Sequence, residues 1–272
     1  MIKLTALLTS RPELSHAQFV DRYENHHAPL IVDLIPHFQK YRRNFLLQSL
    51  NAPHIAAHPI PDVPFHAITE MWYPDTAAIE AQTRAIAGSA GQIIAEDERR
   101  IFDRSRLCMF ASEERVTEPE RLKARPSACV GQPRFKLSGL LRKSEHLSDT
   151  QFRHYYEARH VELALQLMRR AGEPIFAAYS RSYVQSDQIM PIGDPPGLVV
   201  DFDVITDIGF WTREDLDAFL ALAGDPTVSR ILAEDEARLF DRDNVRSFLI
   251  DERETDPADI GGAQAAYPTE KR

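Results

Sequence analysis

The chain has 272 residues, of which 43% are hydrophobic, and a formal net charge of −9 at pH 7. This composition supports a sizeable core, and the acidic balance argues against a nucleic-acid partner, whose binding surface normally has clustered Lys and Arg. Because no apolar stretch reaches about 18 residues and the N-terminus has no signal-peptide pattern, we expect a soluble, cytoplasmic protein that does not enter a membrane.

The chain contains the same unit twice. Residues 3–30 align without gaps on residues 136–163, with 12 of 28 positions identical, and residues 95–104 match residues 233–242 at 8 of 10 positions. A single copy of a duplicated unit normally cannot bury its apolar face, so the copies pack together. We therefore expect two similar halves, 1–112 and 135–250, with a charged linker at 113–134 and a polar tail at 251–272.

The elements of each copy follow one order. The first copy predicts strands at 2–8, 41–46, 65–72 and 107–111, with helices after Ser15 and Asp75. The second predicts strands at 135–141, 179–184, 200–208 and 245–250, with helices after Ser148 and Thr212. This β-α-β-β-α-β order is the ferredoxin-like unit. The predicted fold class is α+β, with two ferredoxin-like repeats forming an intramolecular pseudo-dimeric α/β barrel around a lumen. The long, Pro-rich segments 50–64 and 185–197 are typical of binding loops.

The first helix of each copy ends in a histidine. Phe19, Tyr23 and His27 share one helix face, and Phe152, Tyr156 and His160 are their counterparts. His27 precedes Ala28-Pro29, and a histidine there could exchange protons near neutral pH. The alternative is a partly buried histidine bonded to a backbone carbonyl. The presence of His160 in the second copy favours a functional role.

The third strand of each copy carries acidic side chains on one face. His66 and Glu70 alternate with residues of the other face, and Asp203 and Asp207 are their counterparts. If the other face packs on the helices, these four side chains point into the lumen. A carboxylate beside apolar walls would have a raised pKa and could act as an acid or base. The alternative is an exposed sheet face with ordinary solvated charges.

The second strand of each copy keeps a tyrosine and an arginine on one face, Tyr41 with Arg43 and Tyr179 with Arg181. A hydroxyl and a guanidinium could hold an enolate, carboxylate or phenolate. For the arginines we favour another reading, in which they pair with Asp97 and Asp235 as an internal brace.

Signals for metals and cofactors are weak. His54 and His58 are four apart but lie in a Pro-rich segment, and the two cysteines, Cys108 and Cys129, form no C-x-x-C pattern. No glycine-rich phosphate loop occurs. We therefore expect no metal and no cofactor, although a haem ligand among the histidines stays open.

The segment 3–30, with its Phe19, Tyr23 and His27-Ala28-Pro29, resembles the EthD family of the dimeric α/β-barrel superfamily, and the block 95–104 is similar to that family's closing helix. The resemblance implies the barrel fold and cofactor-independent chemistry on small aromatic or polyketide-like compounds. Superfamily members also include cofactor-free monooxygenases, lactone isomerases and haem proteins, so the fold selects no reaction. In the second copy Val161-Glu162 replaces Ala-Pro, which predicts that the first copy does the chemistry.

The sequence-based hypothesis is therefore a lyase of the decarboxylase or dehydratase type, acting by acid-base catalysis on a small aromatic or hydrophobic substrate. The expected catalytic residues are His27, Tyr23, Glu70 and His66. The expected substrate-binding residues are Tyr41, Arg43, His160, Tyr156, Tyr179 and Asp207. A cofactor-free monooxygenase of a phenolic substrate and a non-catalytic small-molecule binding protein are the alternatives, and a homodimer is possible.

Overall fold

The computed structural model describes residues 1–49, 63–192, 200–256 and 258–260. The first repeat consists of β1 (Ile2–Leu8), α1 (His16–Arg22), η1 (Tyr23–His27), α2 (Ala28–Leu34), β2 (Lys40–Ser49), β3 (Ala67–Tyr73), α3 (Thr76–Ile86), α4 (Ser89–Ile101), η2 (Arg104–Arg106) and β4 (Leu107–Val116). A short turn, η3 (Pro119–Arg121), follows. The second repeat consists of β5 (Phe135–Leu141), α5 (Asp149–Tyr155), η4 (Tyr156–His160), α6 (Val161–Leu167), β6 (Arg169–Arg170), β7 (Glu173–Pro174), β8 (Ala178–Ile192), β9 (Val204–Phe210), α7 (Arg213–Gly224), α8 (Pro226–Glu236), η5 (Arg242–Asn244) and β10 (Arg246–Thr255).

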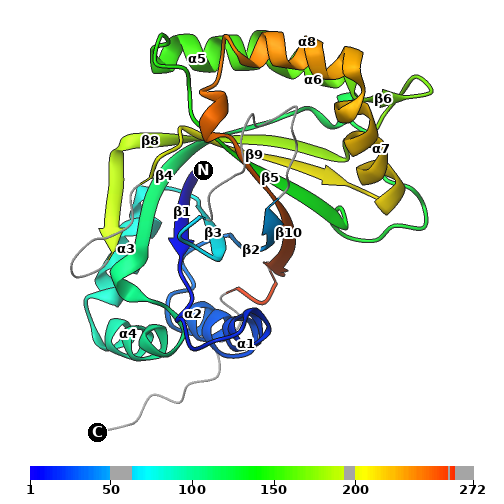
Figure 1. Ribbon diagram of the computed structural model, residues 1–272. Helices are drawn as coiled ribbons and strands as arrows, with labels where there is room; N and C mark the ends of the chain where they lie inside the picture. The colour runs from blue at the N-terminus through cyan, green and yellow to red at the C-terminus, as the bar shows by residue number, and fades with distance from the viewer. Residues whose placement is uncertain (50–62, 193–199, 257, 261–272) are drawn as a thin grey trace, which may run out of the picture.

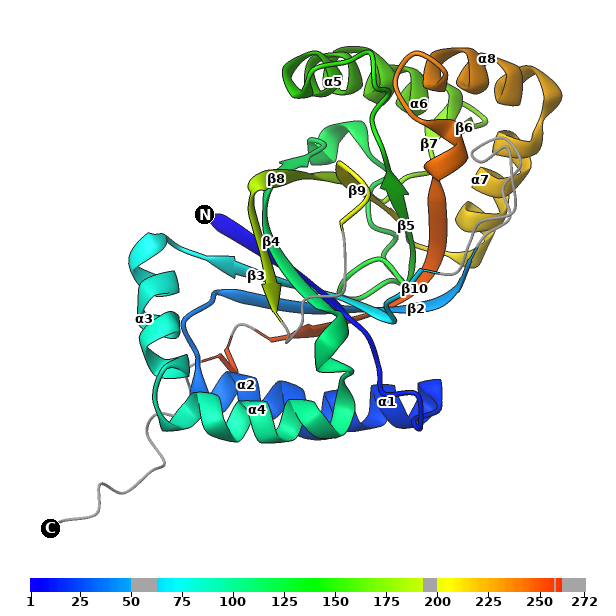
Figure 2. The same cartoon turned by 60° about the vertical axis from the view of Figure 1, so that its left-hand side comes forward.

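Eight strands form one closed antiparallel barrel in the order β1-β3-β2-β10-β5-β9-β8-β4 (Figure 1). Each repeat contributes four neighbouring strands, and the two sheets join along β2–β10 and β4–β8. The helices of the two repeats cover opposite sides of the barrel (Figure 2). The predicted fold class, an intramolecular pseudo-dimeric α/β barrel, is confirmed. Closure leaves the sheet without a free edge, which is the usual route by which a β structure avoids edge pairing with other chains.

The predicted helix starts agree with the structure. Ser15 and Ser148 each form a capping box with a glutamine three residues on, and the side chains of Asp75 and Thr212 accept bonds from backbone N–H groups of α3 and α7. The predicted first helix, however, is not a uniform α-helix. A π-helical segment of five residues, η1 in one repeat and η4 in the other, follows α1 and α5 and ends on His27 and His160. Such π segments often occur at functional sites.

Three strands continue into segments that the sequence indicated as linker, tail or loop. β4 continues to Val116 inside the predicted linker, β10 continues to Thr255 inside the predicted tail, and β8 continues to Ile192 inside a predicted loop. These extensions pair with the other repeat: β10 continues along β2, and β4 along β8. In the sequence, the charged residues of these extensions resembled a linker and a tail, because the strands with which they pair are distant along the chain.

The hydrophobic residues form three clusters. One lies between the first sheet and its helices around Phe19 and Tyr23, and a second lies at the equivalent place in the second repeat around Phe152 and Tyr156. The third fills one end of the barrel interior, where residues such as Phe110 and others of both repeats meet. None of the helices in the described parts of the chain is long and apolar enough to cross a membrane.

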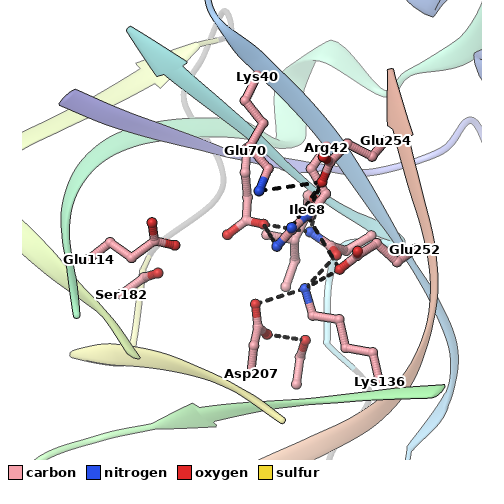
Figure 3. Close-up of polar contacts among 12 residues, drawn as sticks. Lys40, Arg42, Ile68, Glu70, Glu114, Lys136, Ser182, Asp207, Glu252 and Glu254 are labelled. Carbon is pink, nitrogen blue, oxygen red and sulfur yellow. Dashed lines mark hydrogen bonds and ion pairs between the residues drawn. The ribbon is translucent and has the colours of Figure 1, made fainter. Parts of the chain in front are cut away.

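The other end of the barrel interior contains buried ion pairs (Figure 3). Lys3 Nζ lies 2.5 Å from Glu70 Oε1 and 2.8 Å from Glu114 Oε1, and it donates to Ser182 Oγ of the second repeat at 2.7 Å. The Lys3 side chain is 2% exposed and that of Glu70 1%. Lys3 therefore links both repeats from inside the barrel.

Lys136 makes the equivalent set of contacts in the second repeat. Its Nζ lies 2.8 Å from Asp207 Oδ2 and 2.9 Å from Glu252 Oε2, and it donates to Asn44 Oδ1 of the first repeat at 2.8 Å. Arg42 adds an ion pair with Glu252 at 3.4 Å. The duplicated sequence thus forms a pseudo-twofold ionic core, in which each lysine binds two carboxylates of its own repeat and one polar side chain of the other.

Candidate active site

The predicted lumen site needs correction, although Glu70 and Asp207 do point into the barrel as expected. Burial alone would raise the pKa of Glu70, but Lys3, Lys136 and Arg42 hold that pKa well below its usual range. The prediction of a raised pKa was wrong because it assumed apolar walls and did not include the lysines of the first strands. Glu70 and Asp207 are ion-paired members of the core, and the lowered pKa of Glu70 makes its carboxylate a poor proton donor.

His66 and Asp203 lie outside the lumen, contrary to the strand alternation. His66 is exposed, and its Nδ1 accepts a hydrogen bond from the Ser10 backbone N–H at 3.1 Å. Asp203 Oδ2 accepts from the Lys143 backbone N–H at 2.8 Å. Both residues precede the regular strands β3 and β9, so the alternation does not extend to them.

The two strand-two arginines form braces, but with different partners from those expected. Arg43 makes a bidentate contact with Glu24, with Nε and Nη2 at 2.9 and 2.7 Å, and donates to Thr255 Oγ1 of the other repeat at 2.6 Å. Arg181 contacts Glu157 in the same way and donates to Thr117 Oγ1 at 2.6 Å. The predicted pairing with Asp97 and Asp235 was wrong because these aspartates bind the histidines.

His27 lies between the first sheet and its helices and is 4% exposed. Its Nδ1 is 2.9 Å from Asp97 Oδ2, and the hydrogen bond with His27 lowers the pKa of Asp97. Tyr23 Oη bonds Thr69 Oγ1 at 2.7 Å, and Tyr41 Oη donates to Tyr23 Oη at 3.3 Å. His27 therefore bonds a carboxylate, not the backbone carbonyl of the structural alternative.

The second repeat reproduces this arrangement. His160 Nδ1 is 2.8 Å from Asp235 Oδ2, and Tyr156 Oη bonds Thr206 Oγ1 at 2.7 Å. Burial would raise the pKa of Asp235, but its hydrogen bonds with His160 and Tyr155 lower it, so this carboxylate stays charged. With Nδ1 bonded to a carboxylate, the nitrogen of His160 that remains for a ligand is Nε2.

A cavity of about 100 Å³ lies between the outer face of the second sheet and the helices of that repeat. His160, Tyr156 and Tyr179, all predicted as substrate-binding residues, line it. The rest of the wall is mostly apolar, with Phe176 and Phe219 among its aromatic side chains. An apolar wall with a few convergent polar groups is the usual character of a small-molecule site.

Glu236 adds an acid to this cavity. It is 6% exposed, and its Oε2 has no hydrogen-bond partner among the residues that the structure describes, with Arg242 Nε at 3.5 Å. Burial raises the pKa of Glu236 to about 8, Arg242 lowers it and Asp235 raises it further. Burial likewise raises the pKa of Tyr179 to about 12. At neutral pH Glu236 is therefore mainly a neutral carboxylic acid that can donate a proton.

Sequence reasoning missed Asp235 and Glu236 as site residues. A signal for them was present, because the block A-E-D-E occurs in both copies and gives Asp97 and Glu98 in the first copy as equivalents of Asp235 and Glu236. The block was interpreted only as part of a closing helix. Among the described residues no group of three or more His, Cys, Asp or Glu is arranged to hold a metal. His54 and His58 lie outside the described residues.

Comparisons with known proteins bear on the family and the fold. The family model described as the EthD domain matches residues 11–105 and 144–243. A solved structure of an anthrone oxidase-like protein is similar over 98% of this chain and 96% of its own, with 12% identity and a TM-score of 0.53. No curated protein matches the sequence.

Two further solved structures are less similar. A monooxygenase described as putative, from Lactobacillus acidophilus, has 14% identity and a TM-score of 0.44, with 92% of this chain and 93% of its own covered. A chlorite dismutase described as putative has 12% identity and a TM-score of 0.45, with 96% and 99% covered. At these identities the likeness concerns the fold alone. Since the family model covers both halves of one closed barrel, the chain belongs to the EthD family as a tandem protein with two EthD domains.

Proposed function

We propose that the protein is an enzyme that moves protons on a small, largely apolar compound bound in the second-repeat cavity. The observation that carries this proposal is that His160, oriented by Asp235, and a neutral Glu236 line the same apolar cavity. A histidine and a protonated carboxylic acid that line one cavity can serve as a base and an acid toward the same substrate.

The base is His160. Asp235 stays charged and accepts the Nδ1–H hydrogen bond, so the ring nitrogen that can take a proton from a substrate is Nε2. The acid is Glu236, because a carboxyl group with a pKa of about 8 still holds its proton at pH 7. An apolar wall excludes water, and so strengthens both interactions with a bound substrate.

This pair suits a lyase of the dehydratase or decarboxylase type. In a dehydration, Nε2 of His160 takes a carbon-bound proton, a C=C bond forms, and the hydroxyl group leaves as water with the proton of Glu236. In a decarboxylation, the substrate carboxylate leaves as CO₂ and Glu236 protonates the carbanion. After the dehydration His160 loses its extra proton to solvent and Glu236 regains one, and after the decarboxylation Glu236 alone regains a proton from solvent. General acid-base help of this kind contributes about 10²–10⁴-fold in rate.

The substrate class follows from the size of the cavity. A dry cavity of roughly 150 Å³ is known to hold benzene, and this cavity is smaller, at about 100 Å³, so it limits the bound group to a small apolar compound or the reacting end of a longer one. We therefore propose a small aromatic or polyketide-like compound. The proposal places the reaction in the second repeat, whereas the His27-Ala28-Pro29 context had favoured the first.

The test is turnover of a panel of small aromatic and β-keto acids and β-hydroxy ketones by the purified protein with no added cofactor, followed by mass spectrometry. Glu236→Gln should lower turnover by roughly 10²-fold and abolish the loss of activity that the wild type shows above about pH 8. Oxygen uptake with a phenolic substrate would favour a monooxygenase instead. Bound compounds that are never converted would favour a binding protein.

A further inference from the structure

The sheet walls of the two repeats differ in side-chain size at one pair of facing positions. In the second repeat Gly139 on β5 lies opposite Ser247 on β10, and both line the cavity. At the equivalent positions of the first repeat Ala6 on β1 lies opposite Met109 on β4. Gly139 is smaller than the equivalent Ala6 by a methyl group, and Ser247 is smaller than the equivalent Met109 by most of the methionine side chain. The sheet wall of the second repeat therefore projects less toward its helices.

The helix wall differs in the same direction. Ala164 on α6 lines the cavity, whereas the equivalent residue on α2 is Ile31, which is 7% exposed and belongs to the first repeat's core. Packed interiors leave few voids larger than a water molecule, so the loss of an isoleucine side chain opens space unless the neighbours move inward.

Space, rather than backbone conformation, explains Gly139. The described glycines with positive φ are Gly131 and Gly172, so Gly139 does not need the left-handed region. A Cβ atom built at Gly139 would meet its nearest heavy atoms, among them Ser247 Oγ, at 3.7–3.8 Å, which is ordinary van der Waals contact. An alanine therefore fits there, as Ala6 does in the first repeat.

The polar framework, in contrast, is the same in both repeats. The His–Asp hydrogen bond measures 2.9 Å for His27 and 2.8 Å for His160, and the Tyr–Thr hydrogen bond measures 2.7 Å in each. The two sites thus differ in their walls while they keep the same histidine geometry.

We propose that Gly139, Ala164 and Ser247 determine which repeat binds the ligand, and that the first repeat is a closed copy of the same site, filled by Ile31 and Met109. The proposal rests on the proposed function only in identifying the second-repeat cavity as the substrate site. The closed copy has a base and its orienting carboxylate but lacks the space for a substrate.

Benzene is a suitable probe because it is a small apolar ring, and a dry apolar cavity of roughly 150 Å³ is known to bind it. Wild-type protein should bind one benzene per chain, located in crystals against Ala164 and quantified by titration calorimetry. Ala164→Ile and Ser247→Met, which install the first-repeat residues, should each weaken binding at least tenfold. The double variant Ile31→Ala/Met109→Ser should bind two, the second beside His27. Ile93→Ala, an exposed position on α4, is the control and should bind one.

Retained binding in Ala164→Ile and Ser247→Met, or a stoichiometry of one in the folded double variant, would overturn the proposal. Circular dichroism reports whether each variant folds, and Met109→Ser alone is the milder opening if the double variant does not. Benzene binding is independent of turnover. A protein that shows this binding pattern but converts no compound would refute the proposed function and would still support the proposal that Gly139, Ala164 and Ser247 determine which repeat binds the ligand.

Discussion

The carboxylate of Asp235 lies 2.8 Å from Nδ1 of His160, and the next residue along α8 is the acid that lines the same cavity. Two consecutive residues thus supply an orienting partner for the base and a proton donor. His160 ends the π segment η4, and its ring lies edge-on against Phe240, which follows α8 in the chain.

The two histidines should differ in their effect on turnover. His160→Gln keeps much of the side-chain size but cannot serve as the base, so we expect turnover to fall about 10²–10⁴-fold with little change in substrate affinity. His27→Gln is the matched control, since it alters the same hydrogen-bond geometry in the closed repeat. Steady-state kinetics of the two folded variants decide the matter. Equal losses would contradict the asymmetry of the repeats, and a larger loss in His27→Gln would return the site to the first repeat.

Glu236 should make the protein less stable as the pH rises. Its pKa is about 8 in the fold and 4.5 as the ordinary value, so between these values the folded state holds a proton that the unfolded state has lost. The contribution is complete below about pH 4.5 and is lost as the pH rises toward 8, with a slope of at most about 1.4 kcal/mol per pH unit. Urea unfolding from pH 5 to 8.5 measures it. The wild type should lose stability relative to Glu236→Gln over this range, whereas Glu96→Gln, an exposed position on α4, should follow the wild type.

Replacing a single charged side chain of the ionic core by an apolar one should lower the free energy of unfolding strongly. Lys136→Met leaves the buried Asp207 and the half-buried Glu252 without their shared cation, and such a change typically costs about 3–5 kcal/mol in the free energy of unfolding. Lys40→Met is the comparison, because Lys40 is 31% exposed and lies 3.5 Å from Glu254, which predicts a loss below about 1 kcal/mol. Denaturant titration gives both values. Similar small losses would mean that water reaches the barrel interior.

The two halves should assemble with each other. Lys3 bonds Ser182, Lys136 bonds Asn44 and Arg43 bonds Thr255, all across the repeat boundary, and the strands β2 and β4 pair with β10 and β8. A half expressed alone would expose these strands and is expected to aggregate or self-associate. Residues 1–134 and 135–272 mixed after separate expression should give a one-to-one complex in light scattering. Two halves that fold, stay monomeric and do not associate when mixed would contradict this prediction.

Much of the fold could be predicted from the sequence because it depends on local patterns. The bounds of β1 and β5 agree with the predicted strands, Ser15 and Ser148 cap the helices, and the repeat indicated a single pseudo-twofold barrel. His160, Tyr156 and Tyr179 were predicted as substrate-binding residues because each has an equivalent in the other copy, and in the structure all three line one cavity.

The site itself depended on side chains that meet only in the folded protein. Whether Glu70 has a raised or a lowered pKa depends on Lys3, which is 67 positions away, and on Lys136 of the other repeat. Which residues line the second-repeat cavity, among them Gly139, Ala164 and Ser247, depends on how two strands and a helix pack together. The sequence by itself determined the duplication, the elements and the paired histidines, since these are local or repeated patterns. The tertiary structure decided where charge is neutralised and where space is left, because both are sums over neighbours that are remote along the chain.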